Sequence, residues 1–280
     1  MTKPAPTGIL GQAKIHFFRD MFLYLIKSSK FAAERITFMF YCCGITEKGI
    51  KPRNEDAILL NNTVLTEGKM ELRIDKPFIA AVCDGVSGEN SGDIASKMCL
   101  AELAKQEFSS EFNFQQAIMK IHKQLKHYGM FHKNSSNMQT TLCGFAVDEK
   151  KQMYCINVGD SRLYRFRDSE LKQLSKDQSL VQMLYEQGKI TYEEKRKHIH
   201  RNIIMPVLGN NSAKPTIDVS MINDKAESGD VYLVCSDGLS DYVIKSEIEE
   251  ILSMPMCMTK RLTELVKRSL KKGCRDNVSI

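Results

Sequence analysis

Acidic residues recur at the ends of short apolar runs throughout this sequence of 280 residues. One example is Asp84, which follows the apolar run 78–83 and precedes a glycine. The acidic residues in such positions are Glu55, Asp56, Asp84, Asp160, Asp237, Asp241 and Asp276. A single Asp-Gly pair beyond a strand is usually only a turn. Several such sites in one chain favour a cluster of carboxylates gathered at the ends of strands.

Carboxylates that lie close together repel one another, and this repulsion limits the chemistry they can do. Like charges raise one another's pKa, and a bound cation relieves the repulsion. Oxygen ligands of this kind bind hard divalent ions such as Mg²⁺ and Mn²⁺. The sequence therefore predicts an oxygen-rich metal centre, provided that the strands deliver the carboxylates to one place.

The elements that must position these carboxylates are short strands and a few helices. Apolar runs that end in Gly, Asp, Asn or Ser predict strands over 78–83, 140–147, 153–158, 162–166 and 231–235. Apolar residues at helical spacing predict helices over 94–108, 112–128 and 262–270. Strands in pairs, with two consecutive helices between them, favour antiparallel sheets covered by helices over a regular alternation of strands and helices.

The composition is typical of a globular protein, with 42% apolar and 26% charged residues, and it excludes a disordered or collagen-like chain. The 40 Lys and Arg residues against 34 Asp and Glu residues give a formal net charge of +6. Residues 1–40 hold six basic and two acidic residues, so most of the excess lies there. A charge balance this mild argues against a nucleic acid as the partner.

The nine cysteines are scattered, include no CxxC pair, and lie mostly inside apolar runs. This usage indicates a reduced, intracellular protein without a zinc site. No signal peptide is visible at the start of the chain. The apolar N-terminal run 21–26 is far too short to span a membrane. We therefore expect a cytoplasmic protein.

Residues 1–40 are expected to form an extension, with a basic amphipathic helix from Ile9 to about Met39. Apolar residues between Ile15 and Ile26 recur at spacings of three and four, so they fall on one helical face. Such a helix either packs on the main body, or docks the protein to a partner or to an anionic membrane surface. The sequence leaves both possibilities open.

The order of the acidic motifs resembles that of the metal-dependent (PPM, type 2C) Ser/Thr protein phosphatases. The matching segments are 51–57 (KPRNEDA), 81–88 (AVCDGVSG), 139–141 (QTT), 158–162 (VGDSR), 174–179 (LSKDQS), 236–241 (SDGLSD) and 275–277 (RDN). The stretch 179–209 looks like the flap of the bacterial members. The resemblance implies a catalytic domain over 41–280 with an α+β fold, in which two packed antiparallel sheets (a β-sandwich) are flanked by helices on both sides (αββα).

The resemblance also implies roles for the acidic residues at two Mn²⁺ or Mg²⁺ ions. Asp84 would bridge both ions, and Gly85 would offer its carbonyl oxygen. Asp237 and Asp276 would complete the shell of one ion. The adjacent pair Glu55-Asp56 would hold the other ion or its waters.

A third, weaker ion is often bound in bacterial relatives, and its ligands would be Asp160, Asp237 and Asp241. The implied reaction is hydrolysis of phosphoserine or phosphothreonine in a phosphoprotein substrate, by in-line attack of a metal-bridging hydroxide. A monomer is expected. By this resemblance the catalytic residues would be Asp84, Asp237, Lys51 and Arg53.

Three positions depart from the family pattern. Lys51 stands where the family has its phosphate-binding Arg, and it cannot form the planar bidentate contact of a guanidinium group, so Arg53 is an alternative ligand. Val86 stands where many eukaryotic members have a His proposed as general acid, and it cannot donate a proton. Gln178 stands where a His is usual. These departures keep a second hypothesis open, in which the protein is a catalytically impaired pseudophosphatase that acts as a binding or regulatory module.

Overall fold

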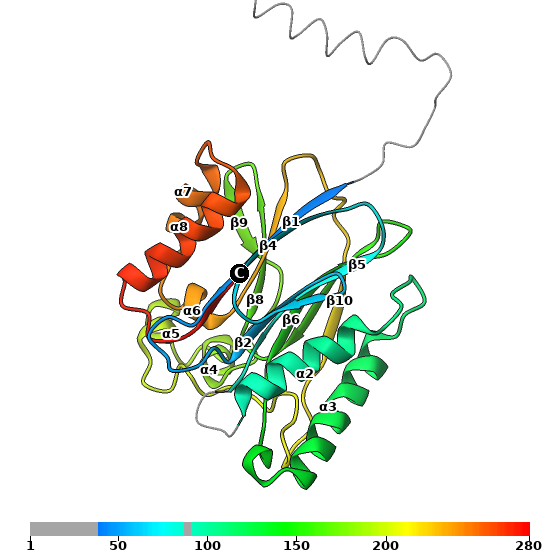
Figure 1. Cartoon of the computed structure of the whole chain (residues 1–280). Helices are drawn as coiled ribbons and strands as arrows, with labels where there is room; N and C mark the ends of the chain where they lie inside the picture. The colour runs from blue at the N-terminus through cyan, green and yellow to red at the C-terminus, as the bar shows by residue number, and fades with distance from the viewer. Residues whose placement is uncertain (1–38, 87–90) are drawn as a thin grey trace, which may run out of the picture. The chain divides into compact units, whose positions relative to one another are not determined.

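The computed structural model describes residues 39–86 and 91–280 (Figure 1). The helix predicted for the N-terminal extension therefore lies outside the described residues, apart from Met39. Phe40, the last residue of the predicted extension, is the first residue of strand β1 (Phe40–Glu47). Its ring packs edge-on against the rings of Phe78 and Phe145, so Phe40 is part of the main body.

Within the described residues, the larger sheet has six strands, and every neighbouring pair in it is antiparallel. In spatial order these strands are β10 (Asp218–Ile222), β7 (Met153–Val158), β6 (Leu142–Val147), β5 (Phe78–Asp84), β2 (Asp56–Leu60) and β3 (Thr63–Leu65). Strands β5, β6 and β7 are neighbours in sequence as well as in space. Two helices, α2 (Gly92–Ala104) and α3 (Phe114–Phe131), are inserted between β5 and β6.

The second layer consists of two antiparallel three-stranded sheets. One has the order β12 (Val278–Ser279), β1 and β4 (Gly68–Ile74), and the other has the order β11 (Val231–Cys235), β8 (Arg162–Arg167) and β9 (Glu170–Gln173). The two sheets meet where β11 ends beside β12. There Ser236 N donates to Ser279 O over 3.0 Å, and Ser279 N donates to Ser236 Oγ over 3.1 Å.

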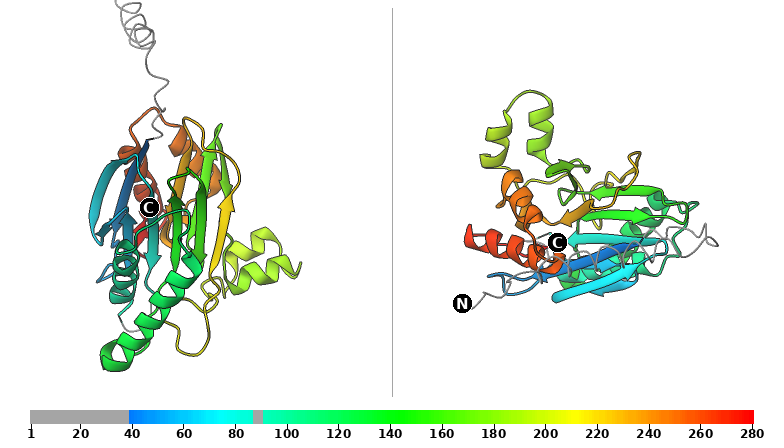
Figure 2. Two further views of the ribbon diagram at one scale, coloured as in Figure 1. Left: turned by 90° about the vertical axis from the view of Figure 1, so that its right-hand side faces the viewer. Right: turned by 90° about the horizontal axis from the view of Figure 1, so that it is seen from above.

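Helices cover the outer face of each layer (Figure 2). Helices α2 and α3 lie on the six-stranded sheet, and α6 (Asp237–Ser240), α7 (Lys245–Ser253) and α8 (Met258–Lys271) lie on the other layer. Two short helices, α4 (Leu180–Glu186) and α5 (Tyr192–Lys197), project from the body, and a 3₁₀ turn covers Lys133–Ser135. In the described part of the chain, no helix has the length and apolar character that crossing a membrane would require.

In strand β5, successive side chains point alternately into the cores on the two sides of the sheet. Phe78 and Val82 point into the core between the two layers, whereas Ile79, Ala81 and Cys83 belong to the core between the six-stranded sheet and helices α2 and α3. Successive residues of a strand face opposite sides of the sheet. A continuous apolar run is therefore required wherever both faces are covered, and this is the pattern that the sequence has in 78–83.

The predicted αββα architecture is confirmed, and the strands 153–158 and 231–235 have the predicted bounds. The strand predicted over 140–147 begins two residues later, at Leu142. Thr140 and Thr141 still form hydrogen bonds to Asp84 of the neighbouring strand, and Thr140 forms isolated bridges with Gly85 and Leu208. The helix predicted over 94–108 lies at 92–104, and the one predicted over 262–270 is longer, at 258–271.

Candidate metal centre

The larger sheet brings Asp84 and Asp56 to the same edge. Asp84 ends β5, Asp56 begins the antiparallel neighbour β2, and the two residues are paired in register. The main chain of Asp84 is held on its other side by β6. Its carbonyl oxygen accepts from Thr141 N over 2.8 Å and from Thr140 Oγ1 over 3.0 Å, and its N–H donates to Thr141 Oγ1 over 3.0 Å. These bonds fix the position from which the Asp84 carboxylate projects.

The second layer brings Asp237 and Asp276 to the same place, at the end of β11 and the start of β12. Their segments touch so closely that a Cβ atom on Gly238 would lie 1.9 Å from the carbonyl oxygen of Asn277. Asn277 also reaches the other layer, because its side-chain oxygen accepts from Glu55 N over 2.9 Å. Glycine at 238 is therefore a steric requirement for this meeting of segments.

Two further contacts join the layers beneath the acidic residues. Ser236 Oγ donates to Asp56 Oδ2 over 2.8 Å in a fully buried position. A Cβ atom on Gly85 would lie 2.4 Å from the main chain of Gly92, and one on Gly92 would lie 3.1 Å from Glu55 Oε1. The loop after β5, the start of α2 and the start of β2 are thus in contact at the same site.

The aspartates are close enough to dominate one another's ionisation. Burial raises the pKa of Asp84 well above its usual range, and the charges of Asp56, Asp237, Asp160 and Asp276 raise it further. Burial likewise raises the pKa of Asp237, together with the charges of Asp160, Asp241, Asp276 and Asp56. The strands therefore gather the predicted carboxylates into one cluster.

Two members of this cluster titrate closer to neutral pH. Burial raises the pKa of Asp56 to about 6, although hydrogen bonds from Ser279 and Ser236 oppose the increase. Burial and the charges of Asp177 and Asp241 raise the pKa of Asp160 to about 7. Asp56 is 2% exposed, whereas Asp160 is partly accessible to solvent. The cluster is therefore closed to solvent at Asp56 and open to it at Asp160.

The donor set fits a hard divalent cation in its chemistry. It consists of carboxylates, together with the main-chain carbonyl groups of the Asp84-Gly85 turn, and such oxygen ligands suit Mg²⁺ and Mn²⁺. The mutual raising of the aspartate pKa values is the repulsion that a cation would remove. Within residues 39–86 and 91–280, no three His, Cys, Asp or Glu side chains are already closed around a single ion position. A bound ion would therefore have to draw the carboxylates together.

The side chains of Lys51 and Arg53, the two candidate phosphate ligands, differ in their surroundings. Lys51 Nζ is 3.1 Å from Asp276 Oδ1 at the acidic cluster. Partial burial lowers the pKa of Lys51, but the hydrogen bond and charge of Asp276 and the charges of Glu55 and Asp84 outweigh this effect and raise it overall. The side chain of Arg53 is exposed. Lys51 is therefore the cation that lies among the acidic residues.

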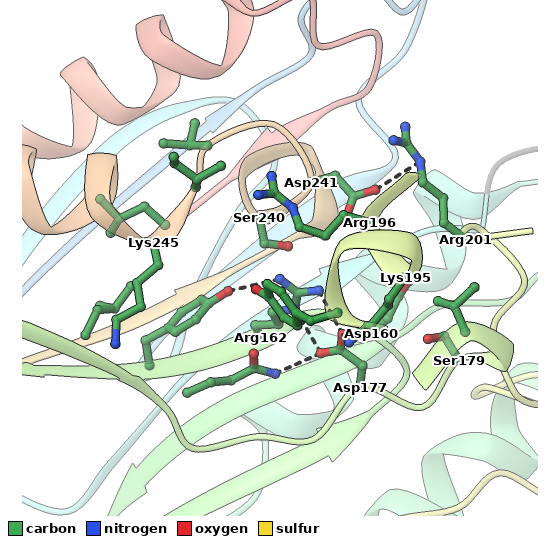
Figure 3. Close-up of a pocket in the computed structure, with 18 of the residues that line it drawn as sticks. Asp160, Arg162, Asp177, Ser179, Lys195, Arg196, Arg201, Ser240, Asp241 and Lys245 are labelled. Atoms are coloured by element: carbon green, nitrogen blue, oxygen red, sulfur yellow. Dashed lines mark hydrogen bonds and ion pairs between the residues drawn. The ribbon is translucent and has the colours of Figure 1, made fainter. Parts of the chain in front are cut away.

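Asp160 and Asp241 lie on one side of the cluster, where they line a pocket beside α5 (Figure 3). The loop that carries Asp160 is held by Gln178, whose Oε1 accepts from Gly159 N over 2.9 Å. The residue that replaces the family's usual His thus has a structural role in this loop. Asp241 Oδ2 is 3.6 Å from Arg201 Nε.

Three ion-paired residues that line this pocket were not foreseen from the sequence. Arg162 donates to both oxygens of Asp177, from Nε over 2.8 Å and from Nη2 over 2.7 Å, and Lys195 Nζ is 3.0 Å from Asp177 Oδ2. Asp177 has only 2% of its side chain exposed. Both Arg162 and Asp177 lie in motifs that match the family, but nothing in their spacing of 15 residues indicates a pair. Lys195 carries no sequence signal at all.

The fold and the acidic site can now be compared with known proteins. The sequence pattern of the family described as Protein phosphatase 2C matches residues 70–274, which is most of the chain.

The chain belongs to the protein phosphatase 2C family. It is 30% identical over 247 residues to the serine/threonine phosphatase stp of Listeria innocua, an alignment that covers 84% of this chain and 92% of that relative. The crystal structure of the Mycobacterium tuberculosis serine/threonine phosphatase PstP/Ppp has a TM-score of 0.70 and 29% identity, over 86% of this chain and 96% of that one. The predicted family, with its bacterial relatives, is therefore confirmed.

A second solved structure bears on the metal centre. The catalytic domain of the serine/threonine protein phosphatase PstP, in complex with two manganese ions, has a TM-score of 0.68 and 28% identity to this chain. The alignment covers 86% of this chain and 95% of that domain. The relative of known structure thus binds the kind of ion that the oxygen donors of this protein suit.

The raised pKa values predict an unusual dependence of stability on pH in the metal-free protein. Asp56 and Asp160 titrate at about 6 and about 7 in the folded state, against about 3.9 when unfolded. Between these values the folded state binds more protons than the unfolded state, so the free energy of unfolding falls as pH rises. In EDTA we expect Tm to be roughly 5 °C lower at pH 8 than at pH 5.

Thermal melts of matched variants test this expectation. Asp160→Asn should flatten the slope, because it removes a group that titrates in this range, whereas Asp218→Asn, an exposed change on β10, should keep it. A wild-type Tm that rises between pH 5 and pH 8 in EDTA would contradict the expectation.

Proposed function

We propose that this protein is a metal-dependent serine/threonine protein phosphatase that hydrolyses phosphoserine and phosphothreonine in protein substrates with two Mn²⁺ or Mg²⁺ ions. The observation that carries the proposal is the group of aspartates at the meeting edge of the two layers, whose charges raise one another's pKa. Membership of the protein phosphatase 2C family and the manganese complex of PstP support the same activity.

Each acidic residue has a role in this proposal. Asp84 would bridge the two ions, the Gly85 carbonyl would be a further ligand, and Asp237 and Asp276 would complete the shell of one ion. The pair Glu55-Asp56 holds an ion or its waters from the β2 side. The hydrogen bonds of Thr140 and Thr141 to Asp84, and that of Asn277 to Glu55, keep these ligands in place.

A third ion would be held by Asp160, Asp237 and Asp241. The charges of Asp160 and Asp241 both raise the pKa of Asp237, which supports their proximity to it. Asp160 and Asp241 are partly accessible to solvent. The contact of Arg201 with Asp241 supplies some positive charge at this edge when no ion is bound.

The chemistry of hydrolysis needs no nucleophile from the protein. Bound divalent ions lower the pKa of a coordinated water to near neutrality and neutralise charge on the phosphoryl oxygens. The carboxylates hold the cations, and Lys51 is positioned to attract the phosphate through its charge. Val86 lies beside this site with its N–H donating to Gln139 O, and its side chain cannot donate a proton. The serine or threonine alkoxide that leaves would then take its proton from water or from another donor.

The alternative is a pseudophosphatase, and one observation favours it. The ion pair between Lys51 and Asp276 occupies a carboxylate that the metal needs and the cation that would bind phosphate. Phosphatase activity is the preferred proposal, because the acidic cluster is retained whole. Gln178, the other departure near the site, keeps the Asp160 loop in place through Gly159.

Replacement of Asp237 tests the activity directly. Asp237→Asn removes one carboxylate charge from the cluster without a change in size. We expect turnover of a phosphopeptide and of an aryl phosphate with millimolar Mn²⁺ to fall by about 100-fold or more. The matched control Asp218→Asn, on the exposed face of β10, should keep wild-type turnover. Wild-type protein that binds Mn²⁺ in calorimetry but hydrolyses neither substrate would favour the pseudophosphatase.

The roles of Lys51 and Arg53 are separated by three variants. If Lys51 attracts the phosphate, Lys51→Ala should raise KM for a phosphopeptide by roughly tenfold, since a hydrogen bond to a charged group contributes about 1.5–3 kcal/mol. Lys51→Arg should retain most of the affinity because it keeps the charge. Arg53→Ala should have little effect. The reverse pattern, with the loss in Arg53→Ala alone, would assign the phosphate to Arg53.

We further propose that the protein is a cytoplasmic monomer and that residues 9–40 dock it to a partner or to an anionic membrane surface. The proposal rests on the basic amphipathic pattern of that segment and on the nine cysteines, all of which are free. Deletion of residues 1–38 should abolish sedimentation with anionic lipid vesicles or capture of a partner, and should leave turnover of an aryl phosphate unchanged. Insoluble protein after the deletion would instead make the segment part of the core.

A further inference from the structure

A cavity of about 330 Å³ lies beside the acidic cluster, and apart from Asp160, Asp241 and Arg201 its lining residues have no role in the reaction proposed above. Its walls come from β8, β9, α5, the end of α6 and the start of α7. Figure 3 shows Arg162 and Asp177 on one side of it and Ser240, Arg196 and Asp241 on the other. Asp160 and Asp241 line it too, so the cavity adjoins the metal centre.

The lining of this cavity has an excess of positive charge. Six basic residues line it against four acidic ones. Asp177 is paired with two cations, Arg162 and Lys195, so that group alone has a net positive charge. Arg196 and Lys172 are exposed and form no ion pair with another residue of the described chain. Metal ions on Asp160 and Asp241 would increase the excess.

A buried hydroxyl group gives a second, independent indication of a ligand. Ser240 is 7% exposed and lines the cavity, and its Oγ has no hydrogen-bond partner in the described structure. Leaving a buried polar group unpaired is unfavourable, so such a group marks a place where a ligand or water binds. Ser240 can donate a hydrogen bond to an anion that enters between it and the basic residues.

We propose that this cavity binds a second phosphoryl group of the substrate, on a serine or threonine near the one being hydrolysed. A phosphate monoester has nearly two negative charges and several acceptor oxygens, which match the Arg196 guanidinium and the Ser240 hydroxyl. Because an extended peptide spans about 3.3–3.6 Å per residue, a residue a few positions away from the metal centre reaches the adjoining cavity. This inference rests on the proposed phosphatase function and narrows its substrates to multiply phosphorylated segments.

The test compares peptides that have one phosphoserine with peptides that have a second one at positions one to four residues away on either side. For the wild-type protein with Mn²⁺, kcat/KM should be roughly tenfold higher for the best doubly phosphorylated peptide than for its singly phosphorylated partner. In Arg196→Ala and in Ser240→Ala this ratio should fall towards one. Lys197→Ala is the matched control, because Lys197 follows on the same helix, is 83% exposed and lies outside the cavity. It should keep the wild-type ratio.

Three results would overturn the inference. The first is an equal kcat/KM of the wild type for both kinds of peptide at every spacing. The second is a ratio that survives in both cavity variants. The third is a pair of findings: inorganic phosphate inhibits the wild type but not Arg196→Ala, and kcat/KM is the same for singly and doubly phosphorylated peptides. This result would mean that the cavity binds a free anion.

A binding measurement separates failure of this inference from failure of the proposed function. Fluorescently labelled peptides with non-hydrolysable phosphonates, in singly and doubly substituted forms, report affinity by anisotropy without turnover. If the wild type with Mn²⁺ does not hydrolyse an aryl phosphate, the phosphatase function alone is contradicted. Equal affinity for the two phosphonate peptides would contradict the cavity assignment alone.

Discussion

Repulsion between carboxylates is the constraint on which the rest of this structure depends. Asp56 is buried, Asp84, Asp160 and Asp237 are partly buried, and their charges oppose one another's ionisation. An arrangement of this kind is unfavourable without a cation. Other contacts of the fold must therefore keep the aspartates close together. The two layers meet at the aspartates and are fastened to each other there by side-chain hydrogen bonds, in which Asn277 accepts from the Glu55 N–H and Ser236 donates to Asp56.

The positive groups near the cluster are each engaged with an acidic residue. Lys51 contacts Asp276 and Arg201 contacts Asp241, while Arg162 and Lys195 are engaged with Asp177. This distribution keeps the centre of the cluster for divalent ions and leaves a basic surround for phosphate. The acidic cluster and the cavity beside it are thus two parts of one electrostatic pattern, with acidic groups at the strand ends and basic groups on β8, on α5 and in the adjoining loops.

Sequence reasoning singled out the acidic residues of this cluster because each follows or precedes an apolar run whose direction is fixed by burial. Asp84 after 78–83 is the clearest case, since a strand buried on both faces delivers its last residue to a defined edge. It did not foresee the supporting contacts. Thr141 and Asn277 act through hydrogen bonds to Asp84 and Glu55, which are 57 and 222 residues away, and no local pattern encodes such a distance. The choice between Lys51 and Arg53 likewise depended on which side chain turns towards the cluster.

The position of the metal centre at a seam between distant segments determines when the site can form. Its contacts join residues that lie 180 residues apart in Ser236–Asp56 and 222 apart in Asn277–Glu55. Closing such long loops is slow compared with local folding. During synthesis, the strands of the larger sheet can pair before the segment around Asn277 has left the ribosome, but the aspartates cannot be gathered until it has. The nascent chain therefore has most of its framework before it has a place to bind metal.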